Sequence, residues 1–189
     1  MKELIINSVL IPSLKQLYAE DYDNIRLGVS ERNICARLAL YMESLIRSSD
    51  YKKYGFDFSP YHVDVEYNRM GFGFAKRYAV DPESTRLMVS DLLIHQRYGG
   101  QNLLAVEMKR IGNYKGAKTD RERLIAMVSS PKTVDRLKNC VYDTLLGVYL
   151  VFSPQGLIMD LYENVDSVGV KTREIIMDYD CHSNCLLER

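Results

Sequence analysis

Neither sign of charge is in excess in this sequence. Lys and Arg together number 25 and Asp and Glu together number 25, so the formal net charge is zero. We therefore do not expect a broadly basic protein that coats nucleic acid without regard to sequence, although a local basic patch is compatible with this balance.

Long apolar runs are also missing, and we do not expect a secretory leader. The longest apolar run, from Leu145 to Phe152, has the length of a strand. It falls far short of the ~20 residues needed to span a bilayer. At the N-terminus, Lys2 and Glu3 stand together and Asn7 interrupts the apolar run, which is not typical of a signal peptide. We expect a cytoplasmic protein without a membrane partner.

Cysteine is scarce, with four residues in the chain. Cys35 and Cys140 lie in apolar surroundings and are expected to be buried. Cys181 and Cys185 flank His182 near the C-terminus, but a structural zinc site needs four ligands and no second Cys/His pair lies nearby. The alternative is a reduced tail, and the absence of a disulfide framework fits a reducing cytoplasm.

The composition is that of one globular domain. The chain has 189 residues, of which 47% are hydrophobic and 26% charged. This length predicts a single domain over 1–189 with a core large enough to fold without disulfides. A first helix is predicted around Leu10 to Tyr18, with Pro12 in its first turn. The clearest helix follows the N-cap Ser30 and runs from Glu31 to Arg47.

Strand patterns dominate the rest of the chain. Alternating residues predict strands at 62–68, 87–95 and 103–109, the last two joined as a hairpin by Gly99 and Gly100. A loop is predicted at 69–81. Thr119 and Glu122 match a capping box for a helix that ends near Ser130. A buried strand is predicted at 142–152, and 157–163 and 173–179 either add strands or pack as an extension. The sequence predicts an α/β protein with a mixed sheet flanked by helices.

Three polar side chains are expected to meet at one end of the predicted hairpin. Period-two alternation places Glu107 and Lys109 on one face of their strand. An antiparallel partner brings Asp91 beside that strand's end. Carboxylates are the ligands that Mg²⁺ prefers, and a lysine beside them can orient water or stabilise charge on a phosphate. This grouping predicts metal-assisted phosphodiester hydrolysis.

Glu31 is a further candidate for this site. It precedes Ile34, Cys35 and Leu38 at helical spacing, so it lies on the buried face of its helix. Its carboxylate either favours the helix dipole at the N-terminus or points into a metal site.

The pattern Asp91, then Glu107-Met108-Lys109, resembles the signature of the PD-(D/E)xK nuclease superfamily, which includes restriction endonucleases and Holliday-junction resolvases. The surrounding words resemble a group of small, uncharacterised bacterial and phage proteins of that superfamily, over about residues 23–152. The matching words are VSERNI (29–34), RLALY (37–41), VDVEYNR (63–69), SDLLIHQR (90–97) and NLLAVEMK (102–109).

The resemblance implies a restriction endonuclease-like core in the order helix, three antiparallel strands, helix and strand, over about 25–152, with a C-terminal extension over 153–189. It implies that Glu31, Asp91 and Glu107 bind Mg²⁺ or Mn²⁺ and that Lys109 assists the attacking water. The expected substrate is nucleic acid, with DNA favoured, and family analogy suggests a homodimer. Ser90 stands where the family has its proline, which makes the start of that strand less well defined.

Two segments near this site are locally basic. The first carries Arg69, Lys76 and Arg77 among aromatic residues, and the second carries Arg110, Lys115 and Lys118. Cations contact phosphates and aromatic rings stack on unpaired bases, so both segments are candidates for nucleic-acid contact, although each is equally consistent with a solvated loop.

Three alternatives remain open at this point. The zero net charge and Ser90 also suit a nuclease-like module that binds nucleic acid or a protein without cutting. Gly112 and Ala117-Lys118-Thr119 approach a P-loop, in which alanine replaces a glycine that wraps phosphate. Glu107 and Lys109 can also form a simple surface ion pair. His95 and Arg97 are expected to be surface or pairing residues, and Glu66 either pairs with Arg69 or joins the site.

Overall fold

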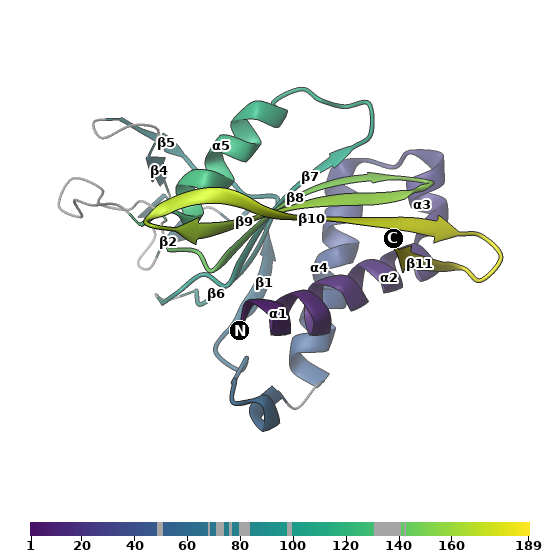
Figure 1. Cartoon of the computed structure of the whole chain (residues 1–189), viewed down its shortest axis with the longest axis horizontal. Helices are drawn as coiled ribbons and strands as arrows, with labels where there is room; N and C mark the ends of the chain where they lie inside the picture. Colours follow the sequence, from purple (N-terminus) through teal and green to yellow (C-terminus); the bar gives the residue numbers. More distant parts are fainter. Residues whose placement is uncertain are drawn as a thin grey trace.

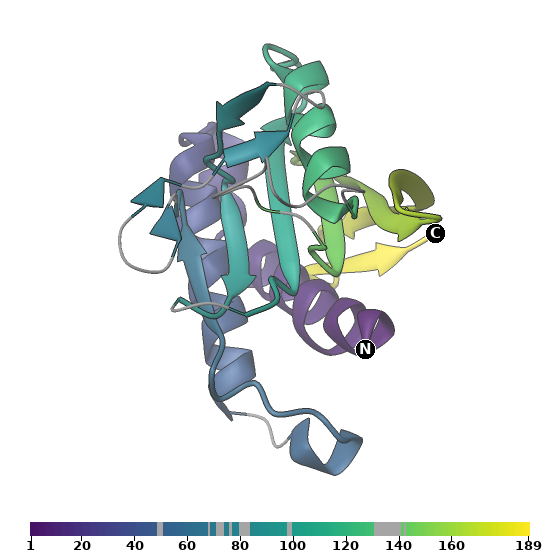
Figure 2. The same cartoon turned by 90° about the vertical axis from the view of Figure 1, so that its left-hand side faces the viewer.

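The computed structural model describes residues 1–48, 51–67, 69–70, 74–75, 77–79, 84–97, 100–130, 141 and 143–189. Seven strands form one mixed sheet in the order β1-β6-β7-β8-β9-β10-β11. Helices lie on both sides of this sheet, with α5 on one face and α2 and α4 on the other (Figure 1, Figure 2). The fold class is therefore α/β, as the sequence predicts.

Only one pair of neighbours in the sheet is parallel. β7 and β8 run parallel, while every other neighbouring pair is antiparallel. The parallel pair requires a crossover, which α5 supplies. The strands of the sheet are β1 (His62–Val65), β6 (Leu92–His95), β7 (Leu104–Arg110), β8 (Leu146–Ser153), β9 (Gly156–Val165), β10 (Val168–Asp180) and β11 (Cys185–Glu188).

The N-terminal helices cover one face of the sheet. They are α1 (Lys2–Ile5), the π-helical turn η1 (Ile6–Leu10), α2 (Ile11–Glu20), α3 (Tyr22–Leu27) and α4 (Glu31–Ser48), with a short 3-10 helix, η2 (Tyr51–Tyr54), after them. The predicted cap at Ser30 is confirmed, because its Oγ accepts a hydrogen bond from the Asn33 N–H at 3.3 Å. Leu14, Leu38 and Met42 are fully buried in the core that these helices share with the sheet.

The other face is covered by α5 (Ala117–Val128), whose Leu124 and Met127 pack with Leu93 and Ala105 of the sheet. The predicted capping box is wrong. The helix begins two residues before Thr119, because Gly116 supplies the N-cap with a left-handed φ of 78° and no side-chain cap bond forms.

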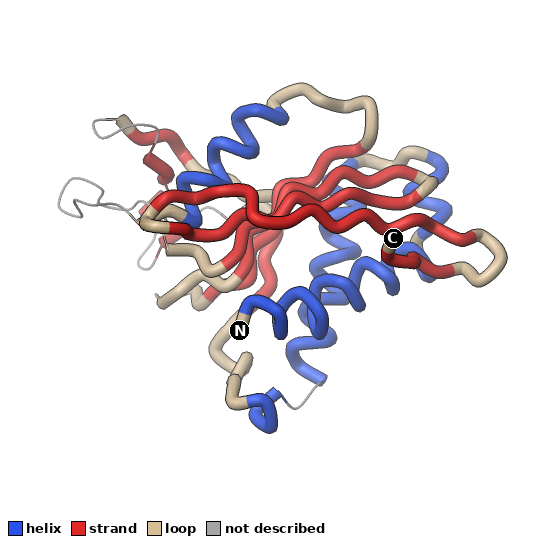
Figure 3. Tube along the Cα trace, in the orientation of Figure 1, coloured by secondary structure: helices blue, strands red, loops and turns tan. Residues whose placement is uncertain are grey.

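The C-terminal segment belongs to the sheet. β9, β10 and β11 follow β8 as consecutive antiparallel strands (Figure 3). Of the two alternatives for 157–163 and 173–179, these segments add strands to the sheet, and the strands are longer than the sequence pattern indicates. β10 passes close to α5 at Gly169, where a Cβ would lie 2.3 Å from the Ile125 carbonyl oxygen.

Several predicted strand boundaries are wrong. The strand predicted at 87–95 is divided, because β5 (Thr85–Leu87) ends at its first residue and β6 begins only at Leu92. β1 stops at Val65 because Glu66 adopts a left-handed φ of 49°. The loop predicted at 69–81 contains three short strands, and the strand predicted at 142–152 begins only at Leu146. The short strands are β2 (Arg69–Met70), β3 (Phe74–Ala75) and β4 (Arg77–Ala79), which pair as β2-β3 and β4-β5.

The predicted turn residue Gly99 and the cysteine Cys140 lie outside the described residues. Cys35 is buried, as expected. Within the part of the chain that the structure describes, no helix has both the length and the apolar character needed to cross a bilayer.

Candidate functional site

Four elements converge where β7 ends: the start of β6, the end of β7 and the first turns of α4 and α5. The pairing of β6 with β7 begins with Leu92 opposite Val106, and Asp91 and Glu107 are the residues directly beyond this pair. The predicted alternation along β7 is confirmed, since Ala105 packs toward α5 and Val106 packs toward the N-terminal helices. The structure therefore brings Asp91, Glu107 and Lys109 to one end of the sheet.

Asp91 is held by the backbone of β7. Its Oδ2 accepts a hydrogen bond of 2.7 Å from the N–H of Met108, the residue between Glu107 and Lys109. This carboxylate takes the place of a backbone acceptor, which explains why regular strand pairing in β6 begins only after it. Burial and the negative charge of Asp120 raise the pKa of Asp91, against the lowering effects of Met108 N–H and Lys109.

Glu107 lies in the interior, with 1% of its surface exposed. Its Oε1 accepts a hydrogen bond of 2.6 Å from Nη1 of Arg123 on α5. Burial raises the pKa of Glu107 well above its ordinary value, and the nearby Asp91 and Asp120 raise it further, while Arg123 opposes the rise. Glu107 is thus not part of a surface ion pair with Lys109, so that alternative is wrong.

Lys109 points inward, with 14% of its side chain exposed. Its Nζ lies 3.1 Å from Asp120 Oδ2 and 4.0 Å from Glu31 Oε2. Burial alone would lower the pKa of Lys109, but the hydrogen bond and charge of Asp120 outweigh it and raise that pKa. The ammonium group is therefore retained between carboxylates from α4 and α5.

Glu31 connects α4 to the end of β7. Its Oε1 accepts hydrogen bonds from the Arg110 N–H at 2.9 Å and from Asn113 Nδ2 at 2.7 Å. These bonds hold the loop between β7 and α5 against the start of α4. The carboxylate of Glu31 thus points into the site. It also lies at the N-terminus of α4, where the helix dipole favours a negative charge.

A pocket of about 230 Å³ opens beside Asp91. Glu31 and Glu66 also line it, and Cys35 lies at its wall, donating a hydrogen bond from Sγ to the Asp91 carbonyl oxygen at 3.0 Å. Glu66 is joined to Arg32 by an ion pair of 2.7 Å at the pocket rim. The pocket thus gives solvent access to the Asp91 side of the site.

Sequence reasoning missed two residues of this site, Asp120 and Arg123. Both lie on α5, where the spacing of three residues places them on one face, and Arg123 Nη2 lies 3.2 Å from Asp120 Oδ1. That spacing, together with the low exposure expected of a helix packed on a sheet, is the only signal in the sequence for them. Because Thr119 was interpreted as the N-cap of this helix, the spacing of Asp120 and Arg123 was not recognised as a signal for the site.

The donor atoms at this end of the sheet suit a hard divalent cation in their chemistry. Glu31, Asp91, Glu107 and Asp120 supply carboxylate oxygens, against the two cations Lys109 and Arg123. Carboxylate oxygens are the usual protein ligands of Mg²⁺. As the side chains stand, no three such groups among the described residues are placed to hold one metal ion. Each of the four is engaged by a cation or an N–H group instead.

The predicted nucleic-acid residues differ in their surroundings. Lys115 is exposed, and Lys118 is exposed with its Nζ 3.8 Å from Glu122 along the helix. The guanidinium of Arg110 lies against Gly28, where a Cβ would be 2.2 Å from it, and Arg77 is bonded to Thr85 in its own hairpin. Arg69 lies in β2, and Lys76 lies outside the described residues.

The loop between β7 and α5 does not support the P-loop alternative. In a P-loop the lysine turns back over the phosphate-binding backbone. Here Lys118 extends toward Glu122, one turn farther along α5, and Asn113 of the same loop is bonded to Glu31. Of the two cysteines near the C-terminus, Cys181 lies in the turn between β10 and β11, and Cys185 is the first residue of β11.

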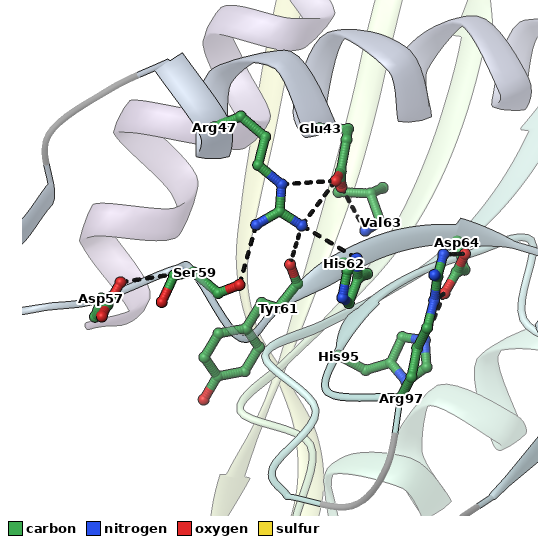
Figure 4. Close-up of polar contacts among 10 residues, drawn as sticks. All are labelled: Glu43, Arg47, Asp57, Ser59, Tyr61, His62, Val63, Asp64, His95 and Arg97. Carbon is green, nitrogen blue, oxygen red and sulfur yellow. Dashed lines mark hydrogen bonds and ion pairs between the residues drawn. The ribbon is translucent and has the colours of Figure 1, made fainter.

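A second polar cluster lies at the opposite end of β6 (Figure 4). His95 is 1% exposed and its Nε2 lies 2.9 Å from Asp64 Oδ2, which also accepts from Arg97. Arg47 of α4 donates to Glu43 and to the Tyr61 carbonyl oxygen. These contacts tie the edge strand β1 to its neighbours. His95 and Arg97 are thus pairing residues, as predicted, and His95 is buried.

A scan of the chain against protein-family models finds no match, and a search of curated proteins finds no similar sequence. The candidate site therefore rests on its own geometry and chemistry.

Proposed function

We propose that this chain is a metal-dependent nuclease that hydrolyses phosphodiester bonds of nucleic acid, with DNA as the favoured substrate. The observation that carries the proposal is the bond from Met108 N–H to Asp91 Oδ2. It joins Asp91 to the residue between Glu107 and Lys109, so the three residues of the predicted signature lie on two backbone segments that are hydrogen-bonded to each other. Lys109 also faces inward rather than toward bulk water.

The order of elements supports a restriction endonuclease-like core. α4, β1, β6, β7, α5 and β8 occur in this order along the chain, with the short strands β2 to β5 inserted between β1 and β6. The first three strands are antiparallel, and β8 is parallel to β7. This is the order that the resemblance to PD-(D/E)xK nucleases implies. Glu31 at the start of α4 matches the helix carboxylate of the resolvase-like branch.

The residues divide the proposed chemistry between them. Asp91, Glu107 and Glu31 would hold Mg²⁺ or Mn²⁺. When bound, the ion supplies polarisation of a phosphoryl oxygen and a hydroxide near neutral pH. Lys109, kept charged by Asp120, would stabilise the negative charge that develops on the phosphate. Lys115 and Lys118, which are exposed on the adjacent loop and helix, would contact phosphates of the substrate.

A reducing cytoplasmic location is part of this proposal. The three cysteines within the described residues, Cys35, Cys181 and Cys185, are free thiols, as expected in a compartment that keeps thiols reduced.

The test is a cleavage panel of single-stranded, duplex and branched DNA and of RNA, with Mg²⁺ or Mn²⁺ and with a chelator. We expect metal-dependent cleavage that Asp91→Asn abolishes and that Asp23→Asn leaves intact. Asp23 is a matched control because its exposed carboxylate pairs only with Arg26 among the contacts in the structure. Activity retained by Asp91→Asn would assign the cleavage to a contaminant.

A binding module without cleavage is the second candidate. The ion pair between Glu107 and Arg123 favours it, because this pair satisfies a predicted metal ligand with a protein cation. Calorimetry with Mn²⁺ discriminates the two functions. A binding module would bind DNA yet take up no Mn²⁺ in a Glu107-dependent manner, whereas the nuclease would lose Mn²⁺ uptake in Glu107→Gln.

A further inference from the structure

Asp120 lies at the centre of a buried chain of charges. Its Oδ2 lies 3.1 Å from Lys109 Nζ, and its Oδ1 lies 3.2 Å from Arg123 Nη2. Lys109 in turn faces Glu31, and Arg123 in turn binds Glu107. Among the residues that the structure describes, Asp120 is therefore the one carboxylate that forms ion pairs with both Lys109 and Arg123.

Arg123 extends this connection to the segment that precedes Asp91. Its Nη1 donates to the Val89 carbonyl oxygen at 2.8 Å as well as to Glu107. α5 is thus bonded through one guanidinium to β7 and to the chain entering β6. A shift in Asp120 would be transmitted through Arg123 to Glu107, and directly to Lys109.

Stability alone is a weak explanation for this arrangement. Asp120 is 6% exposed and Glu107 is 1% exposed, and burying an ion pair gains little over a well-packed apolar pair of the same size. Three buried polar atoms of the same region, Asp120 Oδ2, Arg123 Nε and Tyr149 OH, have no hydrogen-bond partner among the described residues, and Asp120 Oδ2 is engaged only by the ion pair with Lys109. Tyr149 is the β8 partner of Glu107 in the sheet. If this network served only to stabilise the fold, each of its buried polar atoms would be expected to have a hydrogen-bond partner.

We propose that Asp120 is a positioning residue of the candidate centre. It holds the Lys109 ammonium group at the end of β7 and, through Arg123, holds Glu107 in place. This inference rests on the proposed nuclease function for its catalytic consequence, but the placement of Lys109 is testable without any cleavage.

The test compares Asp120→Asn with Asp120→Glu, and uses Glu122→Gln as the matched control. Glu122 lies on the same helix, its side chain is 53% exposed, and its ion pair is with Lys118 alone among the contacts in the structure. The first measurement is heteronuclear NMR of lysine ammonium groups, which detects those held in ion pairs. Loss of a signal in Lys109→Arg assigns it to Lys109. We expect that signal to vanish in Asp120→Asn, to return in Asp120→Glu, and to persist in Glu122→Gln.

The second measurement is the kinetics of cleavage. We expect Asp120→Asn to lower kcat roughly 10²-fold with KM unchanged, because misplacing a catalytic group costs this much without weakening substrate binding. Asp120→Glu should recover part of kcat. Calorimetric Mn²⁺ affinity and the melting temperature are measured on the same samples, and a merely structural role would lower the melting temperature without the split between kcat and KM.

Each failure points to a different proposal. A Lys109 signal that persists in Asp120→Asn overturns the positioning role. A lost signal with unchanged kcat overturns its catalytic consequence. Absence of cleavage by the unaltered protein overturns the proposed function, and the NMR comparison then decides the placement of Lys109 by itself.

Discussion

Arg123 Nη1 lies 2.6 Å from Glu107 Oε1, and the two side chains are 16% and 1% exposed. A buried carboxylate at this depth stays charged only beside a cation. Whether Glu107 is charged therefore depends on Arg123. Lys109 lies at the same end of β7, so this pair also sets the net charge around Lys109. It is also the contact that separates the two candidate functions, because a metal ion and Arg123 compete for the same oxygen atoms.

Removing Arg123 should destabilise the protein in a pH-dependent way. Arg123→Met leaves Glu107 buried without its cation, which we expect to cost about 3–5 kcal/mol of unfolding free energy at a pH where Glu107 is ionised. The pKa of Glu107 is already raised by burial and rises further, so its protonation relieves the loss. The penalty should therefore be largest at a pH above the raised pKa of Glu107 and should shrink as the pH falls through that pKa.

Urea denaturation across this pH range measures the effect. Arg26→Met is the control, because Arg26 pairs with Asp23 on the surface. Adding Glu107→Gln to Arg123→Met should recover much of the loss at pH 7. A penalty independent of pH, or one unaffected by Glu107→Gln, would contradict the assignment of the loss to an uncompensated carboxylate.

Asp91 should separate stability from activity. Asp91→Ala removes the acceptor for the buried N–H of Met108, which we expect to cost about 1–3 kcal/mol. Asp91→Asn keeps an oxygen acceptor and removes the repulsion with Asp120, so its unfolding free energy should equal or exceed that of the unaltered protein. Both variants should lose cleavage. Equal stability of the two variants in urea titrations would show that the Met108 bond contributes nothing.

Asp21 should stabilise the helical layer at neutral pH. Its carboxylate accepts hydrogen bonds from Arg37 at 2.8 Å, Tyr41 at 2.5 Å and Asn24 at 3.0 Å. Burial alone would raise the pKa of Asp21, but the bonds from Tyr41 and Arg37 outweigh it and lower that pKa. The stabilisation is therefore present above the ordinary value of 3.8 and lost as the pH falls through the lowered value.

Thermal and urea unfolding test this contribution. Asp21→Asn should cost about 1–3 kcal/mol at pH 7, and the difference from the unaltered protein should disappear in strong acid. Asp23→Asn, two residues along on the surface, should change stability by less than about 0.5 kcal/mol. A loss in Asp21→Asn that persists at low pH would mean that packing, not the charged hydrogen bonds, is responsible.

Lys115 and Lys118 should contribute to affinity for nucleic acid if the proposed function holds. Each phosphate contact adds roughly one unit to the slope of log affinity against log salt concentration. Lys115→Ala and Lys118→Ala should each reduce that slope by about one unit, for all sequences alike. Lys15→Ala, on the exposed side of α2, should leave it unchanged. Equal slopes in all three variants would remove the loop and the start of α5 from the binding surface.

Local periodicity predicted much of the fold. The helix from Glu31 to Arg47 and the strand ending in Glu107-Met108-Lys109 appear with nearly the expected limits, because apolar side chains recur along each with the period of its element. The order of elements and the face shared by Glu107 and Lys109 follow from the same periods. The prediction that this strand includes the residues just before Leu92 was wrong, because the N–H of Met108 donates to the carboxylate of Asp91 and not to a backbone carbonyl.

The polar groups that pair with Glu107 and Lys109 could not be predicted from the sequence. Asp120 and Arg123 lie more than ten residues after Glu107, on a helix whose start was misplaced, and nothing local pairs them with β7. The sequence by itself determined which residues lie together on one strand face, since backbone geometry dictates that alternation. Only the tertiary structure decided which charges compensate them, because ion pairs between elements depend on how α5 crosses from β7 to β8.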